Sequence, residues 1–381
     1  MKRKISIQLF GVISYALTQW LLMLYFAHMY GLEEAAKYIY YLAVFTPLSI
    51  FFSYGLRNGI ASDKDYNFSF ISYINVSYIG AFLYLVCAYL FFNFFSDLNL
   101  KIFLFTLIFK FSELICEPYY GNFLRRNLSF RYALSRMYKL FFGIVFFVPF
   151  YFLEHFFDID YLGAFGFLIS LFILFYFYDR ADKGDVSSGN DNIYNIIWFN
   201  FPLAASAMVI AFNSSLPKII LGYENQGVDL AIFGFLLYMN SIAILPITAL
   251  IQILYGKNRL NININKYLFF YSLFYFVSFL FLSPYVLKYF FNVNGGYGFI
   301  SLVLTGILGV FQFYLTINNF ILTYYRKFNF IFKLSLLSIF INLIICFFLL
   351  NYGLNGIITS VLISTLASCI FGHYVRIKFC K

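Results

Sequence analysis

The chain alternates long apolar stretches with short polar loops along its whole length. A transmembrane helix needs about 20 mainly apolar residues to cross the hydrocarbon core of a bilayer. Twelve stretches meet this requirement, and the sequence therefore predicts an all-α polytopic membrane protein with twelve transmembrane helices. The twelve predicted spans are residues 5–29, 36–56, 70–94, 102–120, 138–155, 159–178, 194–212, 230–254, 267–289, 297–323, 331–350 and 354–374.

The composition excludes an ordinary soluble protein. Hydrophobic residues make up 62% of the 381 residues and charged residues only 11%, whereas soluble chains are roughly 45–50% apolar and about 25% charged. Disorder is excluded too, because disordered segments contain few aromatic residues. The net charge of +10 reflects basic loops on one side of a membrane, so the expected partner is the lipid bilayer and we expect no nucleic-acid partner.

Lysine and arginine placement predicts the orientation. With the N-terminus in the cytoplasm, 21 of the 26 basic residues fall on the cytoplasmic side and four fall outside. Cytoplasmic loops are enriched in lysine and arginine. We therefore expect a membrane protein with both termini in the cytoplasm and an even number of spans.

Short signals recur in the same order in the two halves of the chain. Residues 163–170 and 353–360 both follow the pattern G-x-x-G-x-x-x-S, and the second and eighth spans contain Pro47 and Pro246. Such recurrence indicates an internal duplication. Since each half has six spans, the two repeats are expected to be parallel, with a transport site between them.

The midpoint of the chain is its most polar stretch. Residues 179–192 read DRADKGDVSSGNDN, which is the composition of a flexible linker. We therefore predict a six-helix lobe over residues 1–178, a cytoplasmic linker over 179–193 and a second six-helix lobe over 194–381.

Charged residues inside a predicted span are the first candidate site. Lys110, Glu113 and Glu117 lie on one helix face, because they are three and four residues apart. An unpaired charge at mid-membrane costs roughly 2.5–3.5 kcal/mol on insertion scales, so this face should point into protein or water. Two interpretations stay open: a site for ion coupling or headgroup contact, and a buried charge network that ties the bundle together.

Other polar residues are candidates for a substrate cavity. Arg57 ends the second span, and a guanidinium suits phosphate because its fork matches two oxygens; the alternative is an ordinary flanking residue that reaches the interface. Gln19, Gln252 and Asn319 belong to polar stripes that could contact sugars. The alternative for each stripe, which we favour slightly, is helix–helix hydrogen bonding.

The sequence contains no residues on which an enzyme function could rest. We find no nucleophile elbow, no phosphate-binding loop and no cysteine or histidine cluster with metal-ligand spacing. His28, His155 and His373 belong to different spans. We therefore expect a protein that is not an enzyme and has no metal site and no cofactor, with proton or sodium coupling as an open option.

Eight short segments, together with the twelve spans and the division into two sets of six, resemble a known group of transporters. The chain resembles the MATE-like multidrug/oligosaccharidyl-lipid/polysaccharide exporter superfamily and, within it, the O-antigen (lipid-linked oligosaccharide) flippases. The resemblance is diffuse and covers the whole chain. The matching segments are residues 26–42, 47–63, 125–139, 161–170, 201–202, 218–222, 233–234 and 351–360.

The resemblance implies a fold and a function. Two six-helix lobes would form a V around a central cavity, and the protein would move an undecaprenyl-pyrophosphate-linked repeat unit from the cytoplasmic to the periplasmic leaflet by alternating access. An O-antigen polymerase and a chain-length regulator are expected as partners. Such a cavity should be cationic, and the available contacts are Arg57 with its neighbour Asn58, Lys110 and Lys218. The chain departs from expectation because its first, seventh and eighth spans contain few basic residues at mid-depth.

Two other functions compete with this hypothesis. A cation-coupled multidrug antiporter of the same fold needs cavity carboxylates, and the first and seventh spans contain none. An O-antigen polymerase or glycan ligase usually carries a large periplasmic loop. The longest predicted outer loop, about residues 213–229, is too short for that.

Overall fold

The chain folds into helices. The computed structural model describes residues 2–63, 67–94, 99–126, 128–181, 192–224, 227–255, 264–293, 295–325 and 328–379. Its helical elements are α1 (Lys2–Met29), α2 (Leu32–Phe52), α3 (Leu56–Ser62), α4 (Phe70–Phe94), α5 (Leu100–Arg125), α6 (Ser129–Phe157), α7 (Leu162–Leu174), the π-helix η1 (Phe175–Asp179), α8 (Ile193–Tyr223), α9 (Gly227–Tyr255), α10 (Ile264–Phe290), α11 (Phe299–Tyr324), α12 (Phe328–Leu349), the 3₁₀-helix η2 (Leu350–Tyr352) and α13 (Gly353–Phe379).

Each of the twelve predicted spans overlaps a helix of the structure, and α7 and η1 together correspond to the sixth span. The predicted fold class is therefore confirmed. Backbone groups in lipid must be satisfied within the segment, which is why long apolar stretches become helices. Within the described residues, ten stretches qualify as membrane spans by length and composition alone. One of these, Asn329–Lys378, contains both α12 and α13. Helix α5 is not among the ten, because Lys110, Glu113 and Glu117 interrupt its apolar sequence.

A short helix that the sequence did not predict follows the second span. The backbone is left-handed at Tyr54 (φ 50°) and Gly55 (φ 60°), which ends α2 and starts α3 in a new direction. Left-handed backbone is unfavourable for residues with a Cβ and natural for glycine. The break lets α3 present Arg57 separately from the rest of the second span.

The chain divides into two compact units. Unit 1 comprises residues 1–22 and 44–208, and unit 2 comprises residues 23–43 and 209–381. Helices α1, α2 and α8 therefore contribute residues to both units. The lobe boundaries predicted from the sequence remain a prediction, and residues 182–191 of the predicted linker lie outside the described residues.

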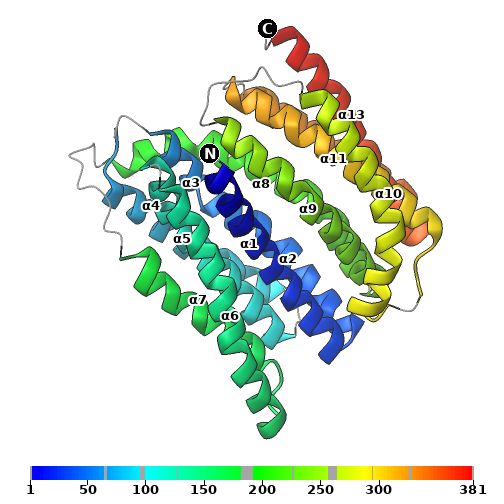
Figure 1. Cartoon of the computed structure of the whole chain (residues 1–381), viewed down its shortest axis with the longest axis horizontal. Helices are drawn as coiled ribbons and strands as arrows, with labels where there is room; N and C mark the ends of the chain where they lie inside the picture. Colours follow the sequence, from blue (N-terminus) through cyan, green and yellow to red (C-terminus); the bar gives the residue numbers. More distant parts are fainter. Residues whose placement is uncertain are drawn as a thin grey trace. The chain divides into compact units, whose positions relative to one another are not determined.

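Helices pair in the same order in the two units, and Figure 1 colours them along the sequence from blue to red. In unit 1, α3 packs on α4 and α5, α5 also packs on α4, α6 and α7, and α6 packs on α7. In unit 2, α9 packs on α10 and α11, α11 also packs on α10, α12 and α13, and α12 packs on α13. Each of these pairs in unit 1 has its counterpart six helices later. A duplicated six-span repeat predicts this pattern of neighbours.

Candidate functional site

Unit 1 contains an ion pair within α5. Lys110 Nζ lies 2.9 Å from Glu113 Oε2, and the lysine side chain is only 4% exposed. Tyr15 of α1 donates a hydrogen bond of 2.7 Å to the other oxygen, Glu113 Oε1, and Gln19 Nε2 donates to the Tyr15 hydroxyl at 3.0 Å. The structure thus forms the Lys110–Glu113 pair that the helical spacing predicts, and it brings Gln19 to the same place.

A second ion pair joins α3 to α5. Arg57 Nε lies 3.5 Å from Glu117 Oε2, and Arg57 Nη1 donates to the Tyr132 hydroxyl at 3.5 Å. Gly121 makes this approach possible, because a Cβ at that position would lie 2.9 Å from the carbonyl oxygen of Arg57. Only glycine lets two helix backbones come so close without displacement. Gly121 therefore fixes the distance at which Arg57 meets Glu117.

A third ion pair joins α6 to the π-helix η1. Lys139 Nζ lies 2.9 Å from Asp179 Oδ2, and Ser135 Oγ donates to Asp179 Oδ1 at 2.7 Å. Lys139 also donates to the Tyr120 hydroxyl at 2.6 Å. Asp179 is completely buried and ends η1. Single π-turns are rare and occur often at functional sites, and this one places a carboxylate against α6.

Arg136 of α6 lies between three tyrosine rings from three helices. Its guanidinium carbon is 4.5 Å from the ring centre of Tyr132, 4.8 Å from that of Tyr15 and 5.8 Å from that of Tyr120. All three distances fall within the range of a cation–π contact, about 6 Å. We call Tyr15, Tyr120 and Tyr132 the tyrosine cage.

Close packing of α1 on α6 sets the position of the cage. A Cβ at Gly11 would lie 2.7 Å from the Cα of Ala133, so the two backbones meet at a glycine. Tyr15 lies four residues after Gly11, and Arg136 lies three residues after Ala133. One helical turn beyond the contact, the Tyr15 ring therefore faces the Arg136 guanidinium.

The tyrosine cage connects all three ion pairs. The Tyr15 hydroxyl binds Glu113, the Tyr132 hydroxyl accepts from Arg57 and the Tyr120 hydroxyl accepts from Lys139. We call the whole assembly the charged cluster. It has four cations and three carboxylates, namely Arg57, Lys110, Arg136, Lys139, Glu113, Glu117 and Asp179.

Arg136 supplies the excess positive charge of the charged cluster. Each of the three carboxylates pairs with one of the other three cations. The Nε atom of Arg136 is buried and has no hydrogen-bond partner among the described residues. A buried donor without an acceptor costs about 1–3 kcal/mol. An oxyanion at Nε would remove this cost, so the charged cluster is suited to an anionic ligand.

Exposure differs across the charged cluster. The side chains of Arg57, Glu113 and Glu117 are 34%, 24% and 21% exposed, whereas those of Lys110 and Asp179 are 4% and 0% exposed. Partly exposed charges can exchange their partner for a ligand, whereas separating a fully buried pair leaves a charge that is neither paired nor solvated. Arg57, Glu113 and Glu117 therefore form the accessible part of the cluster.

The other residues predicted for a cavity are not among the members of the cluster listed above. Asn58 follows Arg57 in α3 and its side chain is exposed. Lys218 in α8 and Asn319 in α11 are partly buried residues of unit 2. Gln252 lies in α9, and its side chain is outside the described residues.

Several members of the charged cluster were missed by sequence reasoning. Arg136 lies just before the fifth predicted span and Lys139 at its cytoplasmic start, and Asp179 is the first residue of the predicted linker, so none of the three was a candidate site residue. A signal for two of them was present: Tyr132, Arg136 and Lys139 are spaced four and three residues apart, which places them on one face of a helix. Tyr120 continues the face of Lys110, Glu113 and Glu117, because it lies three residues after Glu117, but Tyr15 had no signal that separates it from the other tyrosines among the 35 in the chain.

Neutral side chains connect helices in unit 2. Asn342 of α12 donates to Asn213 Oδ1 of α8 at 3.0 Å and accepts from Ser360 Oγ of α13 at 3.1 Å. Asn240 of α9 donates to the carbonyl oxygen of Thr305 in α11 at 3.1 Å. These residues are buried or half-buried, and their contacts resemble the hydrogen bonds that hold membrane bundles together.

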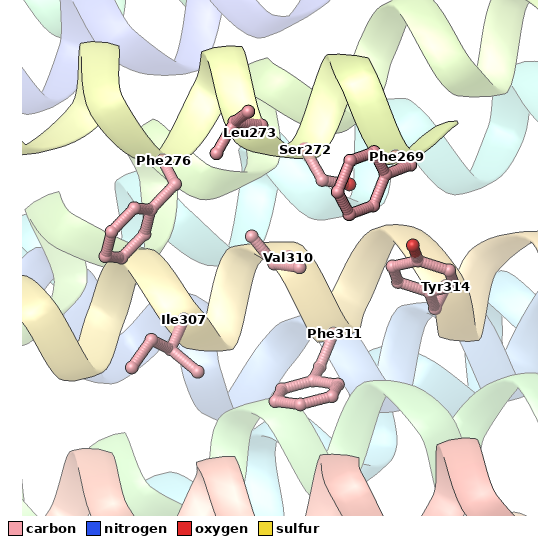
Figure 2. Close-up of a pocket in the computed structure, with 8 residues that line it drawn as sticks. All are labelled: Phe269, Ser272, Leu273, Phe276, Ile307, Val310, Phe311 and Tyr314. Carbon is pink, nitrogen blue, oxygen red and sulfur yellow. The ribbon is translucent and has the colours of Figure 1, made fainter. Parts of the chain in front are cut away.

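An apolar cavity of about 290 Å³ lies between α10 and α11 in unit 2. Figure 2 shows that its lining residues come from these two helices, with Phe276 and Val310 between them. The polar side chains in the lining are Ser272 and Tyr314. Ligand sites usually combine apolar walls with several convergent polar groups, so this cavity suits a hydrocarbon chain and not a charged headgroup. No group of three histidine, cysteine, aspartate or glutamate side chains in the described part of the chain could hold a metal ion.

Comparison with known proteins identifies the fold. No protein-family model matches the sequence, and no curated protein matches it. Among solved structures, the chain is similar to the MATE multidrug transporter DinF-BH, with a TM-score of 0.75, 15% identity and coverage of 99% of this chain and 95% of that one. It is also similar to a mutant of the Vibrio cholerae MATE transporter VcmN (TM-score 0.60, 14% identity, 99% and 96% coverage).

A third similar structure is a MOP superfamily transporter from Pyrococcus furiosus, with a TM-score of 0.59, 14% identity and coverage of 98% and 94% of the two chains. That protein is described as having a binding pocket of reverse polarity, which suggests a different function for it. At these identities the likeness establishes the fold, and function has to be argued from the residues. The chain therefore has the twelve-helix fold of MATE transporters.

Proposed function

We propose that this chain is a membrane transporter whose cargo is an anionic, pyrophosphate-linked oligosaccharide lipid. The observation that carries the proposal is the excess positive charge at Arg136, whose buried Nε has no partner among the described residues. Phosphate oxygens are preferred acceptors for guanidinium groups. The binding pocket of reverse polarity described for the Pyrococcus furiosus transporter supports the idea that pocket polarity can differ among proteins of this fold.

In this proposal Arg57 makes the first contact with the cargo. Arg57 is the most exposed cation among the three ion pairs of the cluster, and its bond to Glu117 is long, at 3.5 Å. A pyrophosphate can replace Glu117 at the guanidinium fork, while Glu117 stays partly solvated. Arg136 then offers its buried Nε–H as a second donor, between the tyrosine rings. Alternating access of the two sides would carry the headgroup across while its polyprenyl chain stays in the lipid.

The distribution of basic residues supports the proposed location in a bacterial inner membrane and the cytoplasmic position of both termini. With the termini in the cytoplasm, 21 of the 26 basic residues face the cytoplasm, as the positive-inside rule expects for an inner-membrane protein. The cargo is then an undecaprenyl-pyrophosphate-linked repeat unit of a surface polysaccharide such as O-antigen, flipped from the cytoplasmic to the periplasmic leaflet. An O-antigen polymerase and a chain-length regulator would act on the flipped unit.

A cation-coupled multidrug antiporter is the second candidate. The structural similarity to proteins described as MATE multidrug transporters favours it, and the partly exposed Glu113 and Glu117 are the carboxylates that could bind a proton, a sodium ion or a cationic drug. The pairing of each of these carboxylates with a cation counts against this candidate. A cationic drug would have to displace Lys110 or Arg57 from its partner.

Reconstitution into liposomes tests the two candidates against each other. The protein should accelerate the transbilayer movement of a fluorescent short-chain polyprenyl-pyrophosphate sugar, and it should not move the uncharged polyprenol analogue. Arg57→Gln and Arg136→Gln should each reduce the rate about tenfold or more, since a charge-assisted hydrogen bond is worth about 1.5–3 kcal/mol. Movement of a lipophilic cation driven by a proton or sodium gradient, with no movement of the pyrophosphate lipid, would establish the antiporter and overturn the proposal.

A further inference from the structure

We propose that Arg136 is the specificity-determining residue of the charged cluster, because its guanidinium fills a tyrosine cage that would otherwise bind an organic cation. This inference goes beyond the proposed cargo: it assigns a latent cation site that the chain closes with its own side chain. The ring centres of Tyr132, Tyr15 and Tyr120 lie 4.5, 4.8 and 5.8 Å from the guanidinium carbon.

Three aromatic faces around one point are the usual recognition site for quaternary ammonium and guanidinium ions. The negative face of each ring attracts a cation within about 6 Å, and the attraction grows when the site is shielded from water. Tyr120 and Tyr132 also support each other, since their ring centres are 5.0 Å apart in an edge-to-face arrangement. The cage is therefore a built aromatic site and not a chance contact of one ring.

The hydroxyl groups of the cage hold its rings in place. Tyr15 donates to Glu113, Tyr132 accepts from Arg57 and Tyr120 accepts from Lys139. Each ring is thus anchored through its hydroxyl to an ion pair that does not involve Arg136. Removal of the Arg136 side chain should leave the three rings in their positions, with a vacant space for a cation between them.

Arg136 changes the selectivity of the charged cluster in two ways. It occupies the aromatic space, so an external cation cannot enter, and it raises the cluster from three cations to four against three carboxylates. With Arg136 absent, the charges balance and the aromatic faces become available. One side chain therefore decides whether this site attracts anions or admits cations.

The test uses the full-length protein, purified in detergent, and two small probes, ethylguanidinium and tetramethylammonium. Isothermal titration should show no saturable binding to the wild type and saturable binding of both probes to Arg136→Ala. Arg136→Lys should behave like the wild type, because its ammonium group also satisfies the aromatic faces. Ethylguanidinium should raise the melting temperature of Arg136→Ala and leave that of the wild type unchanged.

Two further variants show whether the bound probe sits in the cage. Tyr15→Leu and Tyr132→Leu, each added to Arg136→Ala, should weaken binding about threefold or more per ring, in keeping with the strength of a cation–π contact. A well-folded Arg136→Ala that binds neither probe would overturn the proposal, as would binding that is unaffected by both tyrosine changes. If Arg136→Ala does not fold, Arg136→Gln replaces it in the same titrations. Saturable binding of either probe to Arg136→Gln, even if weak, supports the proposal because the wild type binds neither. Absence of binding to Arg136→Gln overturns it.

The outcome is separable from that of the proposed function. Cation binding to Arg136→Ala is measured without any lipid-linked oligosaccharide, so the cage can be established even if the chain does not transport that cargo. Conversely, flipping of the pyrophosphate lipid by the wild type can be established even if the vacated cage stays empty.

Discussion

Unit 1 and unit 2 pair their helices in the same order, yet the polar groups that join those helices differ in kind. In unit 1, α5 contains Lys110, Glu113 and Glu117, which pair with one another or with α3. In unit 2, the helix with the corresponding neighbours is α11, and its polar residues include Gln312 and Asn319. The two units thus share the order of helix pairing but differ in the polar residues of the corresponding helices, which are charged in α5 and neutral in α11.

The difference indicates how the two units divide their tasks. Burying an amide or a hydroxyl costs little free energy once the group is hydrogen-bonded, and such groups connect helices without adding a net charge. Ion pairs are costly to bury and gain little stability over apolar residues of the same shape. Stability alone therefore does not account for their concentration in unit 1, and in the proposed function these ion pairs serve contact with a charged cargo.

The largest effect is expected from breaking the most buried ion pair. Lys139→Ala leaves Asp179, which is fully buried, with only the Ser135 hydroxyl as a partner among the described residues, and a stranded buried charge costs about 3–5 kcal/mol in unfolding free energy. Addition of Asp179→Ala should restore part of the loss. The measurement is the melting temperature of the purified protein in detergent, compared across the wild type, both single variants and the double variant.

The matched control for Lys139→Ala is Asn342→Ala in unit 2. It removes a buried neutral group that bonds Asn213 and Ser360, and the expected loss is about 1–3 kcal/mol. Equal losses for the two variants, or strict additivity in the Lys139–Asp179 double variant, would contradict the distinction between helices joined by ion pairs in unit 1 and helices joined by neutral side chains in unit 2.

A smaller effect is expected at the Lys110–Glu113 pair, and here the two single changes should differ. Glu113→Ala strands a lysine that is 4% exposed, whereas Lys110→Ala strands a carboxylate that is 24% exposed and still bonded to Tyr15. Glu113→Ala should therefore lower the folded yield and melting temperature more, by roughly 2.5–3.5 kcal/mol on insertion scales. The double variant should lose less than Glu113→Ala alone; an additive double variant would show that the two side chains do not interact.

The transmembrane spans and the Lys110–Glu113 pair could be predicted from the sequence for definite physical reasons. Long apolar stretches specify helices in lipid because the backbone has no other way to satisfy its hydrogen bonds. The Lys110–Glu113 contact is local, so helical periodicity alone placed both residues on one face. The expected role of Lys110, Glu113 and Glu117 in ion coupling remains a prediction, as do the roles of Lys218, Asn319 and Gln252.

The tyrosine cage was beyond the reach of the sequence because it is assembled by tertiary contacts. Tyr15 and Tyr120 are brought to Arg136 by the approach of α1 and α5 to α6, and that approach depends on Gly11 meeting Ala133. Nothing in the sequence distinguishes Gly11 from the other glycines among the 23 in the chain. Helix α3 was missed for a similar reason, since its separation from α2 depends on left-handed backbone at Tyr54 and Gly55.

A moderate effect is expected from Gly121→Ala. The added Cβ would lie 2.9 Å from the Arg57 carbonyl oxygen and 2.9 Å from Ile60 Cβ, so α3 has to move away from α5 at a cost of about 1–3 kcal/mol. This shift lengthens the Arg57–Glu117 contact. We expect a lower melting temperature and reduced transport of the pyrophosphate lipid.

Gly309→Ala in unit 2 is the matched control for Gly121→Ala. Its Cβ would lie 2.5 Å from the Tyr275 hydroxyl oxygen, which should cost a similar amount of stability without touching the charged cluster. Loss of transport in both glycine variants to the same degree would indicate that destabilisation alone, and not the position of Arg57, explains the defect.

The smallest effect on stability, with a large effect on function, is expected from Arg57→Lys. Arg57 is 34% exposed and its contact with Glu117 is 3.5 Å long, so the pair should contribute no more than about 1 kcal/mol and lysine should preserve most of that. Lysine keeps the charge and loses the planar fork that binds two phosphate oxygens at once. Transport of the polyprenyl-pyrophosphate sugar in liposomes should therefore fall about tenfold while the melting temperature stays within a few degrees of the wild type. If Arg57 serves only as a positive charge that flanks a span, it should tolerate replacement by lysine, because both side chains have the same effect on topology. Normal transport in Arg57→Lys and in Arg57→Ala would therefore show that Arg57 is not part of the site, and Arg136 would remain the candidate anion contact.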